Sequence, residues 1–227
     1  MALADDIKSE VTNILHTRWT ERDGKKVPED TEIGLGNDGA NLDAVALYAD
    51  LVDSSGLVAG ETATFAAEVY KCYLVTACRV IRENGGTITA FDGDRVMAVY
   101  LGDRKNSAAA LTAPKLNHAI KKIVNPAIKV QYPNKIYAIE HVVGIDSGKL
   151  LVAKTGIRGS NDLVWVGPAA NTAAKLCAIR EGVPSWITSR VYNMLSPELK
   201  ATSSASLWEP RQWSGSTVYR SAWTWAV

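Results

Sequence analysis

The sequence predicts an α+β fold with a ferredoxin-like βαββαβ core, extended by an N-terminal helix and by C-terminal strands and a helix. The order of segments between residues 44 and 157 supports this, because a strand, a helix, a hairpin, a helix and a strand follow one another. The apolar residues recur at helical spacing in some segments and form short strand-like runs in others. Asp92-Gly93 lies between two such runs and is a hairpin signal. In this topology the first strand and the hairpin are neighbours in one sheet.

The composition is that of a globular protein without a nucleic-acid partner. The 227 residues suffice for one domain with a large core, and 47% hydrophobic and 22% charged residues are ordinary values. The net charge of +1 leaves no basic surplus for binding a duplex. No apolar run approaches the ~18 residues of a membrane helix, and the polar, acidic start does not resemble a signal peptide. Three cysteines without a CxxC pair indicate reduced thiols in a cytoplasmic protein.

We divide the chain into an N-terminal helix with an irregular lead-in, residues 1–40, and one main domain, residues 41–227. The periodicity predicts an amphipathic helix over residues 5–19. Its apolar face comprises Ile7, Val11, Ile14, Leu15 and Trp19. We expect this face to pack on its own domain, and contact with a partner or a second subunit is the alternative. The polar stretch 21–39, which contains glycine and proline, predicts the irregular lead-in.

The core begins with a predicted buried strand over residues 44–50, which a small polar turn at 53–56 follows. Apolar residues at three-and-four spacing from Ala63 to Ile81 then predict the clearest helix of the chain. Asn84-Gly85-Gly86 ends it, because glycine accepts the left-handed cap conformation.

The second half of the core follows the same logic. Strands are predicted at about 87–91 and 95–101, and a helix at roughly 106–124, which Pro126 ends or kinks. Two further strands, about 139–146 and 149–157, are expected around Ser147-Gly148.

A strand at 163–166 and a short helix at 169–180 come next, and small strands and one more helix complete the chain. Four tryptophans crowd its end. They are Trp208, Trp213, Trp223 and Trp225. We expect them to pack in the core or on the sheet, and a platform for a ligand is the alternative.

Two aspartates carry the clearest chemical signal. Asp50 ends the first core strand, and Asp94 lies in the turn of the hairpin. If these strands pair, both carboxylates reach one edge of one sheet. Two hard oxygen ligands suit two divalent cations of the Mg²⁺ or Mn²⁺ type, and such a pair suits in-line displacement at phosphorus. Taken singly, each aspartate could instead serve only its turn.

Two further segments fit the same chemistry. The turn that contains Asp53, Ser54 and Ser55 follows a strand, where backbone amides can cradle phosphate oxygens. Asn171 and Lys175 are four residues apart and share one helical face. An amide beside a cation could orient a sugar and neutralise a phosphoryl group, and a solvated helix face is the alternative.

Four ordered motifs together resemble the catalytic domain of class III nucleotidyl cyclases, over about residues 44–180. They are YADLVDSS (48–55), GGTITAFDGDRVMAVY (85–100), GIDSGKLLVAKTG (144–156) and VWVGPAANTAAKL (164–176). The resemblance implies that Asp50, the backbone of Leu51, and Asp94 hold two metal ions, and that Asn171 positions the ribose. Lys175 stands where the family usually has arginine, so it keeps the charge but loses the bidentate fork. The resemblance to these cyclases also implies a head-to-tail homodimer with shared active sites and a nucleoside triphosphate as substrate.

The base-reading positions depart from the purine cyclases. Ala90 stands where adenylate cyclases usually have lysine, and Val164 where they have Asp or Thr. Guanylate cyclases tend to carry Glu and Cys there. Leaving the polar edge of a purine unpaired costs roughly 1–3 kcal/mol per group, so a purine substrate is disfavoured. Arg95 lies beside this pocket and is either a ligand contact or a turn residue.

The combination, with the lead-in at 20–37 and the end at 219–227, resembles the bacterial pyrimidine cyclases of the Pycsar antiphage system. That resemblance implies conversion of UTP to cyclic UMP, with CTP as the alternative substrate. It also implies a separate effector that the cyclic nucleotide activates, often a membrane-spanning protein. A catalytically inactive nucleotide-binding module is the alternative from another class, and the retention of both metal aspartates argues against it.

Overall fold

The computed structural model describes residues 2–227 and places nine strands in one sheet. Starting from one edge of the sheet, the strands are β3 (Thr87–Asp92), β4 (Arg95–Tyr100), β2 (Asp38–Leu51) and β5 (His141–Ile157), in this spatial order. β2 runs antiparallel to both β4 and β5. This is the strand order of the predicted ferredoxin-like core, so the fold class is confirmed.

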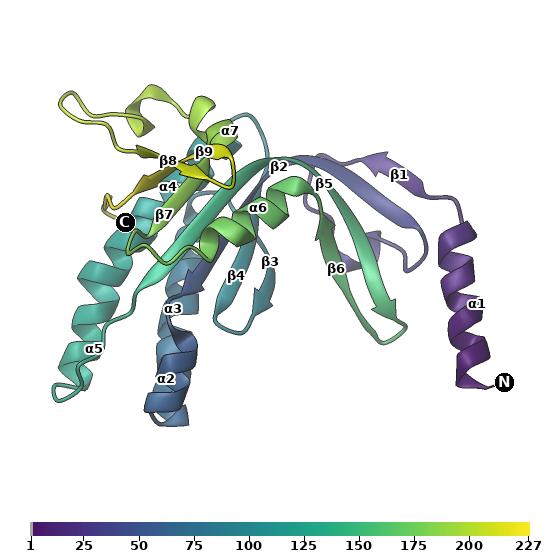
Figure 1. Ribbon diagram of the computed structural model, residues 1–227, viewed down its shortest axis with the longest axis horizontal. Coiled ribbons are helices and arrows are strands. Elements are labelled where there is room, and N and C mark those ends of the chain that lie inside the picture. Colours follow the sequence, from purple (N-terminus) through teal and green to yellow (C-terminus); the bar gives the residue numbers. More distant parts are fainter. Residues whose placement is uncertain (1) are drawn as a thin grey trace.

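Helices cover both faces of this sheet (Figure 1). α3 (Ala63–Glu83) and α4 (Lys105–Ala119) form the main core with one face of β2, to which Val45, Leu47 and Ala49 contribute. α6 (Pro168–Cys177) covers the other face, where Ala44 and Ala46 are buried. Side chains alternate along a strand, so Asp50 lies on the α6 side, in line with Ala46.

The helix predicted at 106–124 does not end at Pro126, which was one of the two expected outcomes, but is interrupted just before it. α4 passes into a π-helical turn, η2 (Ile120–Val124), and then into α5 (Asn125–Gln131). The amide of Asn125 donates to the carbonyl of Ile120 across the wider π turn. Pro126 therefore falls in the first turn of α5, a position that tolerates proline.

The expectation of two strands around Ser147-Gly148 is also wrong, because β5 is one continuous strand of 17 residues. Ser147 pairs with Val45 and Gly148 with Ala44, in unbroken register with β2. Because β2 provides hydrogen-bonding partners along this stretch, the chain does not reverse there. It reverses instead at Gly159, whose φ of +84° permits the turn into β6 (Ser160–Val166).

The N-terminal helix does not pack on its own domain, so this expectation is wrong as well. None of the residues in α1 (Leu3–His16) is buried by the described part of the chain. β1 (Thr20–Asp23) pairs in parallel with the beginning of β2, and α1 projects from that end of the molecule (Figure 1). The side-chain amide of Asn37 donates to the backbone carbonyls of Ile14 and Thr17, which holds the end of the helix there.

The C-terminal part extends the sheet. β7 (Ser185–Thr188) pairs with β5, and β9 (Ser216–Ser221) and β8 (Glu209–Trp213) follow. The remaining short helices are η1 (Asp30–Glu32), α2 (Ser54–Gly60), α7 (Ser189–Asn193) and η3 (Pro197–Leu199).

Of the four clustered tryptophans, Trp208 is buried in the main core and Trp213 packs partly buried. Trp223 and Trp225 are 44% and 41% exposed, so the expected packing is wrong for these two. The chain leaves the sheet after β9 and is held to α4 by polar contacts instead. Asn117 donates to the carbonyl of Trp223, and the amide of Trp225 donates to the carbonyl of Pro114.

Candidate active site

Asp50 and Asp94 meet at the edge of the sheet where β2 ends. Ala49 pairs with Val96 across the two strands, which sets Asp50 beside the two-residue turn Gly93-Asp94. Burial raises the pKa of the Asp50 carboxyl, and the charge of Asp94 raises it further. The topology thus brings together two carboxylates that repel one another.

This arrangement fits divalent cations. The Oδ2 atom of Asp94 is buried and accepts no hydrogen bond from residues 2–227. A buried anionic oxygen without a donor is costly, and a cation shared with Asp50 would remove both the cost and the repulsion. No cluster of three His, Cys, Asp or Glu side chains occurs within the described residues. The other ligands would therefore be backbone, water or substrate oxygens, which is typical of Mg²⁺ sites beside phosphates. Leu51, the predicted backbone ligand, is itself buried and pairs with His141.

The sequence did not indicate Arg180, which also contacts this edge. Its Nη2 donates to Oδ2 of Asp50 over 3.1 Å, and its other nitrogen donates to the carbonyl of Cys177. Arg180 lowers the pKa of Asp50, but burial and Asp94 outweigh it. The residue lies in the irregular segment after α6, 130 positions from Asp50, and no motif or periodicity marks it.

The turn after Asp50 begins a short helix, whereas we predicted only a loop. Asp53 adopts the left-handed conformation with φ of 56° and caps α2, accepting the amide of Gly56 over 3.2 Å. Its carboxylate is thus a capping group. Phosphate contacts at this turn would rest on the backbone amides and hydroxyls of Ser54 and Ser55.

The face beside Asp50 carries a small apolar surface. Ala90 and Tyr48 pack there partly buried, next to Met97. The guanidinium of Arg95 lies 5.8 Å from the centre of the Tyr48 ring and forms a 2.6 Å ion pair with Asp92. Arg95, the first residue of β4, is therefore tied to the end of β3 by Asp92 and also lies beside the Tyr48 ring.

Val164 lies in β6, on a different strand from the residues of this surface. It pairs with Ala153, and Ala153 pairs with Gly39 of β2. In the sheet order, β5, β2 and β4 thus lie between the strand of Val164 and the strand of Ala90.

Asn171 and Lys175 are exposed on α6, as the predicted shared face requires. The opposite face of the helix, with Ala169, Ala173 and Leu176, is buried on the sheet. α6 lies unusually close to β5, because a Cβ atom at Gly144 would come within 2.2 Å of the Ala173 carbonyl oxygen. Both polar side chains consequently point away from their own sheet.

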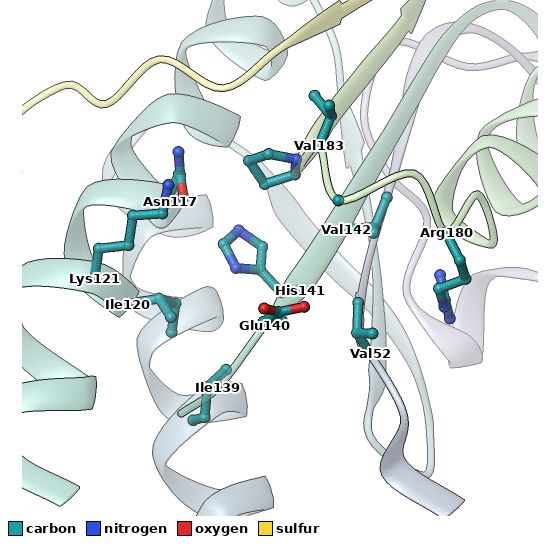
Figure 2. A pocket seen from close by; sticks show the side chains of 12 residues that line it. Val52, Asn117, Ile120, Lys121, Ile139, Glu140, His141, Val142, Arg180 and Val183 are labelled. Carbon is teal, nitrogen blue, oxygen red and sulfur yellow. The ribbon is translucent and has the colours of Figure 1, made fainter. Parts of the chain in front are cut away.

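A cavity of about 290 Å³ lies behind the Asp50 edge, and Val52, Arg180 and His141 contribute to its wall (Figure 2). His141 is buried, and this burial, with a smaller effect of Lys121, lowers its pKa to about 3. His141 is therefore neutral at physiological pH and does not act as a proton donor there.

The buried histidine predicts sensitivity to acid. Below pH 6.5, His141 becomes protonated in the unfolded chain, whereas in the folded chain it stays neutral down to about pH 3. The free energy of unfolding should fall by about 1.4 kcal/mol per pH unit in this window, or about 2 kcal/mol between pH 7 and pH 5. Urea denaturation at both pH values measures it. In His141→Phe, the loss of stability between these two pH values should be smaller than in wild type by this amount. His16→Phe, at an exposed position, should behave as wild type. An equal loss in His141→Phe would contradict the assignment.

Comparison with solved structures identifies the fold. A guanylyl cyclase, Cya2, superimposes with a TM-score of 0.69 at 18% identity, covering 82% of this chain and 94% of the other. The adenylyl cyclase CyaB from P. aeruginosa gives 0.67 at 18% identity, covering 80% and 94%. The structure has the fold of class III nucleotidyl cyclase catalytic domains.

Sequence comparison identifies the family within this class. No protein-family model matches the chain. A uridylate cyclase from Xanthomonas perforans is 44% identical over 231 aligned positions, covering 100% of both chains. One from Burkholderia cepacia is 43% identical with the same coverage, and one from Rhodovulum sp. (strain MB263) is 35% identical over 98% of this chain and 97% of the relative. The chain belongs to the uridylate cyclase family and is a nucleotidyl cyclase.

Proposed function

We propose that this enzyme converts UTP to 3′,5′-cyclic UMP and pyrophosphate. The ribose 3′-oxygen attacks the α-phosphorus, a new P–O bond forms, and pyrophosphate leaves in line. The observation that carries the proposal is the identity of 44% and 43% to two uridylate cyclases over their whole length. The meeting of Asp50 and Asp94 supports the chemistry.

Asp50 and Asp94, with the backbone of Leu51, would hold two divalent cations, Mn²⁺ or Mg²⁺. When bound, these cations would lower the pKa of the attacking hydroxyl and compensate the charge of the triphosphate. Ser54 and Ser55 would hold phosphate oxygens through their amides. The remaining rate enhancement comes from alignment, as is general for phosphoryl transfer.

A head-to-tail homodimer completes each site in this proposal. Asn171 and Lys175 are exposed and face away from their own sheet. A second copy that contributes these two residues would place their polar face against a bound substrate. Asn171 would then position the ribose, and Lys175 would act as a point charge on the phosphorus oxygens.

The surface around Ala90 and Tyr48 would receive the pyrimidine. Ala90 provides no side-chain amine for a purine edge, and the guanidinium of Arg95, which is paired with Asp92, lies beside the Tyr48 ring. UTP and CTP differ there by one carbonyl against one amino group, so cytidylate cyclase activity is the alternative within the class.

Product analysis tests the proposal. Purified protein is incubated with each nucleoside triphosphate and Mn²⁺, and the products are identified by mass. We expect cyclic UMP from UTP. Cyclic CMP as the main product would reassign the substrate, and cyclic AMP as the sole product would overturn the argument from Ala90 and Val164. No product at all would favour a nucleotide-binding module.

We further propose that cyclic UMP serves as a second messenger in antiphage defence and is made in the cytoplasm. The resemblance to the Pycsar cyclases supports this role, and three free cysteines fit the reducing cytoplasm. In residues 2–227 the longest apolar helical stretches fall short of a bilayer span. A separate effector that binds the cyclic nucleotide would carry the response, and it is the component expected at the membrane.

A further inference from the structure

Helix α1 presents an apolar face that its own chain leaves uncovered. Its exposed side chains include Leu3 at 74% and Leu15 at 77%, with Ile7, Val11 and Ile14 on the same face. An isolated helix of 14 residues is marginally stable in water and depends on packing of its apolar face. A surface that covers this face must therefore come from elsewhere.

The architecture prevents α1 from folding back. β1 is fixed to β2 by parallel pairing, and Asn37 holds the carbonyls of Ile14 and Thr17 over 2.7 Å each. Figure 1 shows α1 at one end of the molecule, while α3 and α5 lie at the other. The helix is thus a fixed projection directed away from its own core.

An apolar groove of matching size lies along α3. Its first part, about 390 Å³, runs between α3 and η2–α5, and its second part, about 410 Å³, runs between α3 and α4. Thr76 and Ile123 line both parts, so the groove is continuous. Along α3 it extends from Phe65 to Glu83, about 27 Å of helix, and α1 is about 21 Å long.

We propose that α1 of one protomer docks in this groove of a second copy, and that the exchange is reciprocal. A reciprocal contact closes into a two-fold dimer without leaving either surface open. The occupant is a second copy because the same chain carries both complementary surfaces.

Charge favours this occupant over a membrane. Asp5, Asp6 and Glu10 outnumber Lys8 on α1, whereas helices that lie on membranes are usually rich in Lys and Arg. Arg79 and Lys115 line the second part of the groove together with a single acidic residue, Glu83. The second part of the groove is therefore weakly basic, whereas the first part carries one acidic side chain, Glu68, so the acidic start of α1 would lie along the second part. The proposal shares the homodimer with the proposed function but none of its catalytic assignments.

A native cysteine makes the contact testable. Cys72 is exposed and lines the first part of the groove. Ile7→Cys, Val11→Cys and Ile14→Cys are each treated with a short bismaleimide and separated on a denaturing gel. We expect a covalent dimer from at least one of them. Thr12→Cys, on the polar face, should give no more dimer than wild type, and Cys72→Ser should abolish the product.

Solution mass provides the second measurement. Ile7→Asp and Val75→Asp both alter exposed side chains, so the fold should survive, which circular dichroism checks. We expect each to raise the dissociation constant of the dimer about tenfold or more, and Thr12→Asp to leave it unchanged. No cross-link above the Thr12→Cys level, or unchanged dissociation in both aspartate variants, would overturn the proposal. A cross-link in a protein that forms no cyclic nucleotide would leave this contact standing and refute only the proposed activity.

Discussion

Asp50→Asn and Asp94→Asn should each reduce cyclase turnover by about a thousandfold or more. Each change removes a carboxylate from a pair whose joint charge attracts the cations, and several kcal/mol of transition-state stabilisation correspond to about three factors of ten. Turnover of UTP with Mn²⁺ measures the loss. Asp43→Asn is the matched control, because Asp43 lies on the same strand and forms an exposed ion pair with Lys105.

Thermal stability separates this interpretation from simple unfolding. In metal-free buffer at neutral pH, Asp50→Asn should raise the melting temperature. The folded state holds the Asp50 carboxyl with a raised pKa, so its ionised form costs stability at pH 7 that is recovered only on acidification. Adding Mn²⁺ should raise the melting temperature of wild type and of Asp43→Asn, but not of either site variant. Wild-type turnover in Asp50→Asn or Asp94→Asn would refute the metal assignment.

The central part of this site could be predicted because the relevant signals are local. Periodicity identified α3, the Asp92-Gly93 turn identified the hairpin, and their order selected one topology. That topology by itself sets Asp50 next to Asp94. No contact between distant segments had to be known in advance.

The features that could not be predicted depend on contacts between distant segments. Ser147-Gly148 has turn propensity, but pairing with β2 keeps it extended. Arg180 reaches Asp50 from an irregular segment that carries no periodic signal. The apolar stripe of α1 shows that a surface must cover it, yet periodicity does not reveal to which chain that surface belongs.

Mixing two inactive variants should restore activity, and this is the most direct test of a shared active site. Asp94→Ala removes a carboxylate from one half-site, and Asn171→Ala removes an amide from the other. In each homodimer both sites are defective, so activity should be lost in both preparations. A heterodimer concentrates the two defects in one site and leaves its second site intact.

The expected recovery of activity follows from the fraction of heterodimers in the mixture. Random exchange at equal concentrations gives about half heterodimers, each with one of two sites intact, so activity should reach about a quarter of wild type. A mixture of Asp94→Ala with Asp50→Ala is the matched control. Both changes affect the same half-site, so neither site of that heterodimer is complete and no recovery is expected. Two differently tagged copies that purify together demonstrate exchange. If exchange occurs and the first mixture stays inactive, Asn171 acts within its own chain or not at all, and the exposed polar face of α6 needs another explanation.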